Sequence, residues 1–561
     1  MVKKVLLFLN KEFHGINEAA LLLGSFTFLS QILGLVRDRL LAHVVGAGNT
    51  LDIYYAAFRI PDFLYVSTAS LASITVLMPF FVNYLENSDG FERSKKFLSN
   101  VFSAFMLCMF MVSIIVYFLL PWLANIIAPG FDFESKKMLI STSRIMLLSP
   151  IFIGASNLFG TITQIKKKFF IFSLSPVFYN IGIIMGIIFF YPIFGVVGLS
   201  YGVILGAIFH LLIQIPTLIR YGYFPSFKLK IDWKEIYKVV KVSLPRTLTL
   251  SCGSLAFIAL ISLASKLSPG SISLFTFSFN LQSVPVGIIG ISYSVAVFPV
   301  LVKAYAKKDI ESFRSHVVHG IRQIILWSLP TIALFVVLRA QIVRVLLGVN
   351  TFSWAQTRLT AASVALFIIS LASQAVVLLL VRAYYASGNT KKPLYINIFS
   401  SIMIIIFGYI LLLLFKGSLN FSYFMENILR VEGVPGTNML ALPFAYALGS
   451  LLNVFLLWFS FKKDFLKEIC SGFTRTIIEV GFASFVIGLM SYISLGYFDD
   501  IFILHTFRGI FAQGFFAGLI GIFSGILVLF LIKNKEYLSI ANSISNKIWN
   551  KHISIPEQQD L

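Results

Sequence analysis

The stretch "SQILGLVRDRLLAHVVGAGNTLDIYYAAFRIPD", residues 30–62, places charged side chains inside two runs that are otherwise apolar. The charged residues of these runs are Arg37, Asp38, Arg39, Asp52, Arg59 and Asp62, and Pro61 interrupts the second run. A charge within a membrane-spanning helix is costly, and it usually faces the protein interior or a water-filled cavity. If the two runs cross a membrane, the stretch predicts a polar interior lined by the first two helices.

The composition of the whole chain shows that such runs do cross a membrane. The chain has 561 residues, of which 58% are hydrophobic and 12% charged, and its mean hydropathy is +0.88. Soluble domains carry about 25% charged residues, so a soluble fold is excluded. No nucleophile and base stand in a known catalytic spacing, and the three cysteines lie far apart without a metal-binding pattern. The sequence therefore predicts a transporter-like membrane protein that is not an enzyme and has no metal site or cofactor.

Apolar runs of about 20 residues predict transmembrane helices. We count fourteen such runs, so the predicted fold class is an all-α polytopic membrane protein. They lie at 18–45, 52–86, 97–124, 137–165, 169–192, 195–220, 240–265, 270–305, 317–338, 357–386, 393–415, 438–461, 473–496 and 508–532.

Lysine and arginine alternate in number between successive loops. With the N-terminus inside, thirty of these cations fall in inside loops and nine in outside loops, and the inside loop 220–241 alone holds six. Because cytoplasmic loops carry the excess of Lys and Arg, both termini are predicted to be cytoplasmic, in a multi-pass protein of the cytoplasmic (inner) membrane. The net charge of +21 then needs no nucleic-acid partner.

Several segments resemble one another at a spacing of six helices. Asn180 follows Pro176 by four residues in "SPVFYNIG", and Asn397 follows Pro393 by four in "KPLYINI". "LGAIFHLL" and "LGSLLNVFL" match Gly206 to Gly449, and Pro79 and Pro299 match at the ends of the second and eighth helices. An even offset gives equal orientation, which is typical of transporters built from two parallel repeats.

The repeat defines the predicted domains. These are a cytoplasmic segment 1–16, an N-lobe 17–222, a cytoplasmic linker 223–239, a C-lobe 240–462, two additional helices in 463–534 and a cytoplasmic tail 535–561.

The charges of residues 30–62 have two interpretations, a functional polar lumen or a structural network of ion pairs. Arg37 and Asp38 are adjacent on a helix, so we expect them to point in different directions and not to neutralise each other. Asp52 and Arg59 are seven residues apart and Arg59 and Asp62 three, so each pair is predicted to share a helix face. Both expectations favour the functional polar lumen over the structural network of ion pairs.

Residues 30–62 resemble the start of the MviN/MurJ family of lipid II flippases. Further similarity lies in "APGF" (128–131), "LSYGVILG" (199–206) and "AYYASGNTKKP" (383–393). The resemblance implies the multidrug/oligosaccharidyl-lipid/polysaccharide exporter fold, with two six-helix lobes around a central cavity and two C-terminal helices that form a lipid groove. It also implies transport of undecaprenyl-pyrophosphate-linked peptidoglycan precursor (lipid II) from the inner to the outer leaflet by alternating access, as a step of cell wall biogenesis.

By this resemblance Arg37 and Arg59 contact the diphosphate or sugars of the lipid-linked oligosaccharide. The other substrate-binding candidates are Gln31, Asn280 and Tyr65, and the gating or orienting candidates are Asp38, Asp52 and Asp62. A pyrophosphate in a membrane needs fixed positive charge and hydrogen-bond donors in place of water, and Arg supplies both.

The chain departs from the family pattern at several cavity positions. Gln31, Tyr65, Ser70 and the pair Phe279–Asn280 stand where the family has charged residues, and Arg144 and Arg246 are the candidate replacement cations. The alternatives are a transport-inactive scaffold of the cell-wall machinery and an exporter of another lipid-linked oligosaccharide or drug. Left open are the coupling ion (sodium or a proton) or the membrane potential, cell-wall synthesis proteins as partners beside membrane lipids, and the choice between packing and function for Glu479.

Overall fold

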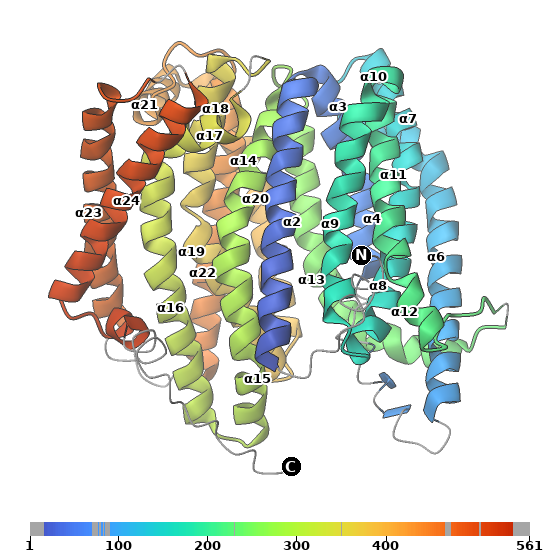
Figure 1. Cartoon of the computed structure of the whole chain (residues 1–561). Coiled ribbons are helices and arrows are strands. Elements are labelled where there is room, and N and C mark those ends of the chain that lie inside the picture. Colours follow the sequence, from blue (N-terminus) through green and yellow to red (C-terminus); the bar gives the residue numbers. More distant parts are fainter. Residues whose placement is uncertain are drawn as a thin grey trace, which may run out of the picture. The chain divides into compact units, whose positions relative to one another are not determined.

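The computed structural model describes residues 16–69, 77, 80–81, 83–84, 90–228, 230–348, 351–465, 473–503 and 506–541, and the regular elements in these ranges are helices (Figure 1). Those up to residue 264 are α2 (Ile16–Val44), α3 (Asn49–Ala57), α4 (Arg59–Ala69), α6 (Gly90–Ile127), α7 (Phe133–Met146), α8 (Leu148–Ile165), α9 (Phe169–Met185), η1 (Gly186–Phe190), α10 (Tyr191–Phe194), α11 (Val196–Leu212), α12 (Ile215–Arg220) and α13 (Trp233–Ala264).

The remaining elements continue the series to residue 531. They are α14 (Ser271–Pro285), η2 (Val286–Ile291), α15 (Ser292–Ala306), α16 (Ile310–Val337), α17 (Arg339–Leu347), α18 (Trp354–Ile368), α19 (Leu371–Ala386), α20 (Lys391–Gly417), α21 (Leu419–Leu429), η3 (Thr437–Leu440), α22 (Ala441–Phe465), α23 (Phe473–Asp499) and α24 (Phe507–Leu531).

Within the described residues, eleven helices are long and apolar enough to cross a membrane, and the pair α18 and α19, bent by 41°, makes a twelfth. These twelve correspond to the twelve predicted runs from 97–124 onward. The predicted run 18–45 is α2, whose 29 residues reach about 44 Å at 1.5 Å per residue. The predicted run 52–86 overlaps α3, contains α4 and includes residues outside the described ranges. The all-helical, polytopic fold class is confirmed.

The chain divides into two compact units. Unit 1 comprises residues 1–281, 346–366 and 389–450, and unit 2 comprises residues 282–345, 367–388 and 451–561. Four of the boundaries fall inside helices α14, α17, α18 and α22. The lobe boundaries expected at 17–222 and 240–462 do not follow this division and stay a prediction.

Unit 1 holds α9 and α11 side by side through small residues (Figure 1). A Cβ on Gly182 would lie 2.2 Å from the Gly206 Cα, and one on Gly186 would lie 2.4 Å from the Gly202 Cα. Only glycine permits this approach, which is the usual way in which membrane helices pack closely. Gly449, the repeat counterpart of Gly206, likewise packs against Ile404 of α20, where a Cβ would come within 2.1 Å of the side chain.

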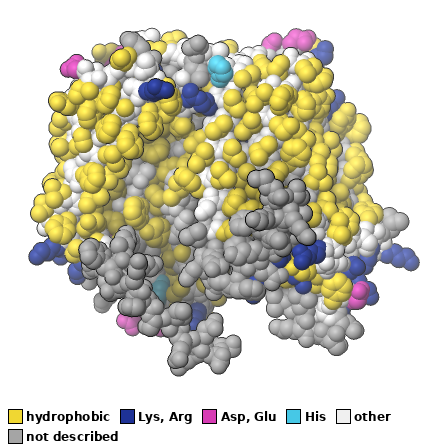
Figure 2. Space-filling model, in the orientation of Figure 1, with side chains coloured by type: hydrophobic (Ala, Val, Ile, Leu, Met, Phe, Trp, Pro, Cys, Tyr) yellow, Lys and Arg dark blue, Asp and Glu magenta, His cyan; other side chains and the backbone are white. Residues whose placement is uncertain are grey.

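Unit 2 uses the same device between α23 and α24. A Cβ on Gly525 would lie 2.3 Å from Cγ1 of Ile487, and one on Gly521 would lie 2.0 Å from Oγ of Ser491. The outward faces of these helices are apolar, as Phe485 and Phe523 show with 67% of each residue exposed. Figure 2 shows hydrophobic side chains over much of the visible face, with Lys and Arg in its upper part and at its lower edge. This arrangement suits a lipid environment, where apolar side chains face outward.

Two expected segments are only partly described. Residues 1–15 of the predicted N-terminal segment and residues 542–561 of the predicted tail lie outside the described ranges. The predicted linker 223–239 is not entirely loop, because α13 begins at Trp233, where the Asp232 side chain caps it by accepting hydrogen bonds from the backbone N–H groups of Lys234 and Glu235.

Candidate functional site

Arg37 and Asp38 form an ion pair in α2. The Arg37 Nη2 lies 2.8 Å from the Asp38 Oδ1, and Nε donates to the same oxygen at 3.0 Å. The expectation that these neighbours would not neutralise each other was therefore wrong. The arginine side chain is long enough to reach the carboxylate of the next residue, although the two Cα–Cβ bonds diverge.

Asp38 is almost fully buried, with 3% of the residue exposed, and its second oxygen has a partner from α14. The side-chain amide of Asn280 donates to Oδ2 of Asp38 at 2.9 Å. A buried carboxylate is tolerated only when its charge is paired and its lone pairs are satisfied, and Arg37 and Asn280 together meet both conditions.

Asn180 of α9 completes this group, which we call the Arg37 cluster: Arg37, Asp38, Asn180 and Asn280. Oδ1 of Asn180 lies 3.5 Å from Nη1 of Arg37. Nδ2 of Asn180 donates to the Ser30 backbone oxygen at 3.3 Å and to the Pro176 backbone oxygen at 3.1 Å. Sequence reasoning used Asn180 only as a marker of the repeat. An amide in an apolar helix, four residues after a proline, was the signal of a buried polar contact.

Asp52 of α3 binds the N-terminus of α14, and it is 3% exposed. Its Oδ2 accepts a hydrogen bond from the Gly270 backbone N–H at 2.7 Å, and its Oδ1 accepts from the Ser273 N–H at 2.7 Å and hydroxyl at 2.5 Å. An anionic side chain at this place satisfies donors that a helix leaves unpaired and interacts favourably with the helix dipole. Gly270 supports the turn with φ of +92°, which favours glycine.

Two further side chains of the predicted C-lobe bind the last turn of α2 and the chain that follows it. Gln356 Nε2 donates to the Ala47 oxygen at 2.7 Å, and Thr351 Oγ1 donates to the Ala42 oxygen at 2.8 Å and to the His43 oxygen at 2.9 Å. With Asp38 and Asp52, these contacts make four hydrogen-bonded joints between the predicted lobes, all of them inside unit 1. We call them the interlobe joints. Neither Gln356 nor Thr351 carried a signal in the sequence, because their partners are backbone atoms.

Arg59 and Asp62 share a face of α4, as predicted, with Nη1 and Oδ2 3.9 Å apart. The Arg59 Nε also donates to the Tyr55 oxygen at 3.0 Å, and its guanidinium lies 4.7 Å from the centre of the Phe257 ring. Asp52, predicted to share the face of Arg59, is bonded to α14 instead. Helix α3 ends at Ala57 and α4 begins at Arg59, so the seven-residue spacing does not run along one helix.

The remaining predicted positions contact neutral side chains or have no hydrogen-bond partner among the described residues. Tyr65 Oη accepts a hydrogen bond from Asn157 Nδ2 at 3.0 Å, and Oε1 of Gln31 is buried without a hydrogen-bond partner in the described part of the chain. Phe279 packs its ring 4.7 Å from that of Phe257. The Arg144 guanidinium lies 4.3 Å from the centre of the Tyr117 ring. Ser70 and the Arg246 side chain lie outside what the structure describes.

The Arg37 cluster and the interlobe joints consist of hydrogen bonds and one ion pair, which a ligand or a helix movement can exchange for others. The described residues include no group of three or more His, Cys, Asp or Glu that could hold a metal ion. Glu479 of α23 accepts hydrogen bonds from Arg475 and, at 2.7 Å, from Nδ2 of Asn534, and both contacts lie within unit 2.

Comparison with known proteins identifies the family of the chain and agrees with its fold. The family model described as "Lipid II flippase MurJ" matches residues 41–517. A "Probable lipid II flippase MurJ" of Buchnera aphidicola subsp. Schizaphis graminum is 28% identical over 506 residues, covering 87% of this chain and 93% of the relative. The "Lipid II flippase MurJ" of Burkholderia cenocepacia is 23% identical over 489 residues, covering 86% of this chain and 90% of the relative.

Solved structures share the fold. A structure described as "Lipid II flippase MurJ, inward closed conformation" superposes with a TM-score of 0.70 at 23% identity, covering 94% of this chain and all of that one. An inward-facing multidrug resistance MATE family transporter of the MOP superfamily gives a TM-score of 0.63 at 17% identity, covering 79% of this chain and 96% of that one. The chain therefore belongs to the MurJ family, as a multi-pass membrane transporter.

Proposed function

We propose that this chain is a flippase that moves lipid II from the inner to the outer leaflet by alternating access, with both termini in the cytoplasm. Membership of the MurJ family supports the class of cargo. The observation that carries the proposal is Arg37, a partly buried guanidinium whose side chain is 23% exposed and whose counter-ion is held by a residue of another helix.

Arg37 has the chemistry that a lipid pyrophosphate requires. A guanidinium offers a planar fork of donors that fits phosphate oxygens, and it cannot lose its charge in this environment. In the present arrangement Asp38 occupies that fork. The substrate diphosphate then competes with the Asp38 carboxylate for the same donors.

Asp38 and Asp52 act as gating residues in this proposal. Each accepts hydrogen bonds from α14, and both sets of bonds break if α14 moves away from α2 and α3. Loss of the Asn280 bond leaves Asp38 with Arg37 alone, and loss of the α14 N-terminus leaves Asp52 buried without a partner. The interlobe joints thus favour the state in which the predicted outer ends of the two lobes are in contact. Breaking the hydrogen bonds of these joints opens the transporter to the outside in the second half of the cycle.

Phe279 favours a second candidate within the same class, the export of a different lipid-linked oligosaccharide. The family pattern places a charged residue at this position, but here the ring packs against Phe257 and Tyr446. A headgroup that makes fewer charged contacts than lipid II would suit such a surface.

Complementation tests the proposal. A host is depleted of its own lipid II flippase, this chain is expressed, and lysis is followed together with the amount of lipid II that a membrane-impermeant hydrolase can cleave from outside. We expect rescue by the wild-type chain and loss of rescue by Arg37→Ala at equal membrane levels. Arg93→Ala, which removes an exposed arginine of α6, is the matched control and should rescue fully.

Each outcome separates the candidates. Rescue by Arg37→Ala would remove the headgroup role of Arg37 but keep the flippase. Well-folded wild-type protein that restores neither survival nor external lipid II would exclude lipid II as cargo. Binding of another lipid-linked oligosaccharide by that protein would then identify the second candidate, and no binding would identify the scaffold.

A further inference from the structure

The first turns of α13, residues 233–244, have one buried face and one exposed face. Val239 is 2% exposed and belongs to the core cluster of unit 1 that contains Phe97 and Leu98, and Ile236 packs against the same cluster. These contacts fix the orientation of the helix about its axis. The opposite face of the same turns is therefore held toward the outside.

Polar contacts fix the start of the helix as well. Asn100 of α6 donates through Nδ2 to Oε2 of Glu235 at 2.8 Å, and its Oδ1 accepts from the Asp232 N–H at 2.9 Å. Tyr84 Oη donates to Oε1 of Glu235 at 2.8 Å. The Glu235 carboxylate therefore faces Asn100 and Tyr84 and accepts hydrogen bonds from both. It does not neutralise the lysines on the opposite face of the helix.

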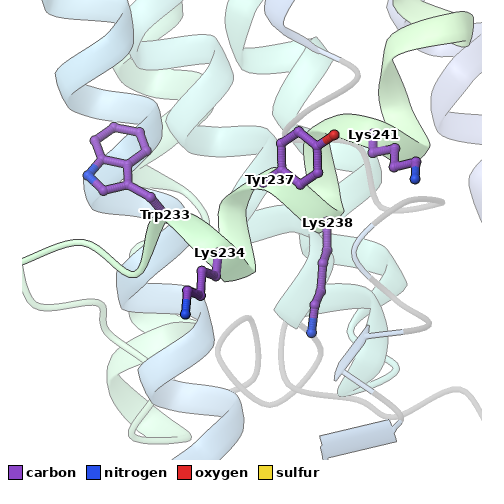
Figure 3. A pocket seen from close by; sticks show the side chains of 5 residues that line it. All are labelled: Trp233, Lys234, Tyr237, Lys238 and Lys241. Carbon is purple, nitrogen blue, oxygen red and sulfur yellow. The ribbon is translucent and has the colours of Figure 1, made fainter.

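The exposed face combines two aromatic side chains with three lysines. Trp233, Lys234, Tyr237, Lys238 and Lys241 line a surface pocket, and Figure 3 shows the three lysine side chains extending from the helix beside the two rings. Trp233 is 59% exposed and Tyr237 is 65% exposed, so most of each residue's surface is left uncovered by the rest of the protein. The spacing of these residues places them on one side of an α-helix.

We propose that this face, Trp233, Lys234, Tyr237, Lys238 and Lys241, binds the phosphate headgroup of an anionic glycerophospholipid in the leaflet predicted to be cytoplasmic. The lysine ammonium groups pair with the phosphate, and the two rings lie at the level of the headgroups. The site is separate from the Arg37 cluster and does not depend on the nature of the cargo.

The chemistry of the face selects a membrane surface over an acidic protein. Trp and Tyr concentrate at membrane–water interfaces because their rings have an apolar body and a polar edge. Lysines near an anionic leaflet add attraction without a fixed geometry. The same helix continues into the membrane-spanning segment Thr247–Ala264, so the face lies where a bilayer surface is within reach.

The test uses the full chain in vesicles of equal parts phosphatidylglycerol and phosphatidylcholine, with bromine on the acyl chains of one lipid or of the other. The fluorescence of Trp233 is obtained as the difference between the wild type and Trp233→Phe, since the chain has six tryptophans. We expect brominated phosphatidylglycerol to quench Trp233 with an apparent affinity about fivefold higher than brominated phosphatidylcholine, an enrichment that one lysine at an anionic surface can supply. A triple variant Lys234→Gln, Lys238→Gln, Lys241→Gln should bring the ratio close to one.

The control variant is Lys303→Gln, Lys307→Gln, Lys391→Gln, which removes three exposed lysines at or near helix ends predicted to lie on the same side. It should keep the wild-type ratio. Equal quenching by the two lipids in the wild type would overturn the proposal and leave an acidic protein as the occupant of the face. A similar loss in both triple variants would also overturn it, because the preference would then follow net charge. The wild-type comparison does not depend on the folding of any lysine variant.

Discussion

The Asp38 carboxylate of α2 accepts a hydrogen bond from the Asn280 side chain of α14, with 2.9 Å between Oδ2 and Nδ2. The other carboxylate oxygen receives both bonds from Arg37. A residue of the predicted C-lobe thus completes an ion pair that belongs to the predicted N-lobe. In the proposed transport cycle, the pairing of Arg37 with Asp38 therefore depends on the position of α14.

Replacing Asn280 by Asp should favour separation of the outer ends. The variant has nearly the same shape, but it puts a second carboxylate against Asp38 and removes a hydrogen bond to a charged group, which contributes about 1.5–3 kcal/mol. The measurement is the distance distribution between spin labels at Lys137 and Pro269 in vesicles, where a longer component should grow at least about tenfold relative to the short one. Asn125→Asp, the same change on an exposed position of α6, should leave the distribution unchanged, and an unchanged distribution in Asn280→Asp would contradict the coupling.

Asp52 should contribute more to the closed outer end than Ser273. Asp52→Asn lowers the acceptor capacity at the α14 N-terminus and removes an anion from the positive end of the helix dipole, at a cost of about 0.5–2 kcal/mol. Ser273→Ala removes one of three bonds. In a cysteine-free background with Leu274→Cys, which is buried, we expect external thiol labelling to accelerate in the order wild type, Ser273→Ala, Asp52→Asn.

Asp500→Asn is the control for that series, since Asp500 is exposed and lies beyond the end of α23. Equal labelling rates in all four proteins would show that the Asp52 contact does not hold the outer end closed.

Arg37→Ala should destabilise the chain, and Asp38→Asn in addition should restore most of the loss. Removing only the arginine leaves a buried carboxylate without its counter-ion, which costs about 3–5 kcal/mol, whereas the double variant removes both charges. Thermal unfolding in detergent gives the stability, and the external lipid II assay gives transport. We expect the double variant to be folded and inactive, and an active double variant would reduce the pair to a structural role.

The helices could be predicted from the sequence because length and apolarity decide whether a segment spans a membrane. All twelve candidate spans coincide with predicted runs, and the bend between α18 and α19 did not disturb the count. The division into units was not predictable, because it depends on which helix ends pack together. The close contact of Gly182 with Gly206 was equally hidden, although Gly206 was noted as part of the repeat.

At the site, the sequence identified the charged residues but not their partners. Arg37, Asp38 and Asp52 were prominent because charges are rare in apolar runs. The donors to Asp52 are backbone N–H groups and a serine, which any sequence contains in number. The direct Arg37–Asp38 pair was missed because helix geometry was applied to the Cα–Cβ directions and not to the reach of the arginine side chain.

Gly182→Ala should lower the amount of folded protein. The added methyl group would lie 2.2 Å from the Gly206 Cα, so α9 and α11 must separate, and such overpacking costs about 1–3 kcal/mol or more. Gly253→Ala is the matched control, because no heavy atom lies within 4 Å of its added Cβ. Thermal unfolding midpoints in detergent should fall for Gly182→Ala and stay or rise slightly for Gly253→Ala, and equal midpoints would show that α9 and α11 can move apart at little cost.

Glu479→Gln should lower stability and leave transport unchanged. Glu479 accepts from Arg475 with one carboxylate oxygen and from Asn534 with the other, so the glutamine, which has one acceptor oxygen, loses one of the two bonds as well as the charge. Because Arg475 is exposed, its contact contributes little, and the expected loss is measured as a slightly lower unfolding midpoint in detergent. Arg475→Gln removes the same ion pair from the other side and should give a similar midpoint. If Glu479→Gln abolished transport while Arg475→Gln did not, the carboxylate would have a role in the transport cycle, and its protonation would become the first candidate for the coupling step.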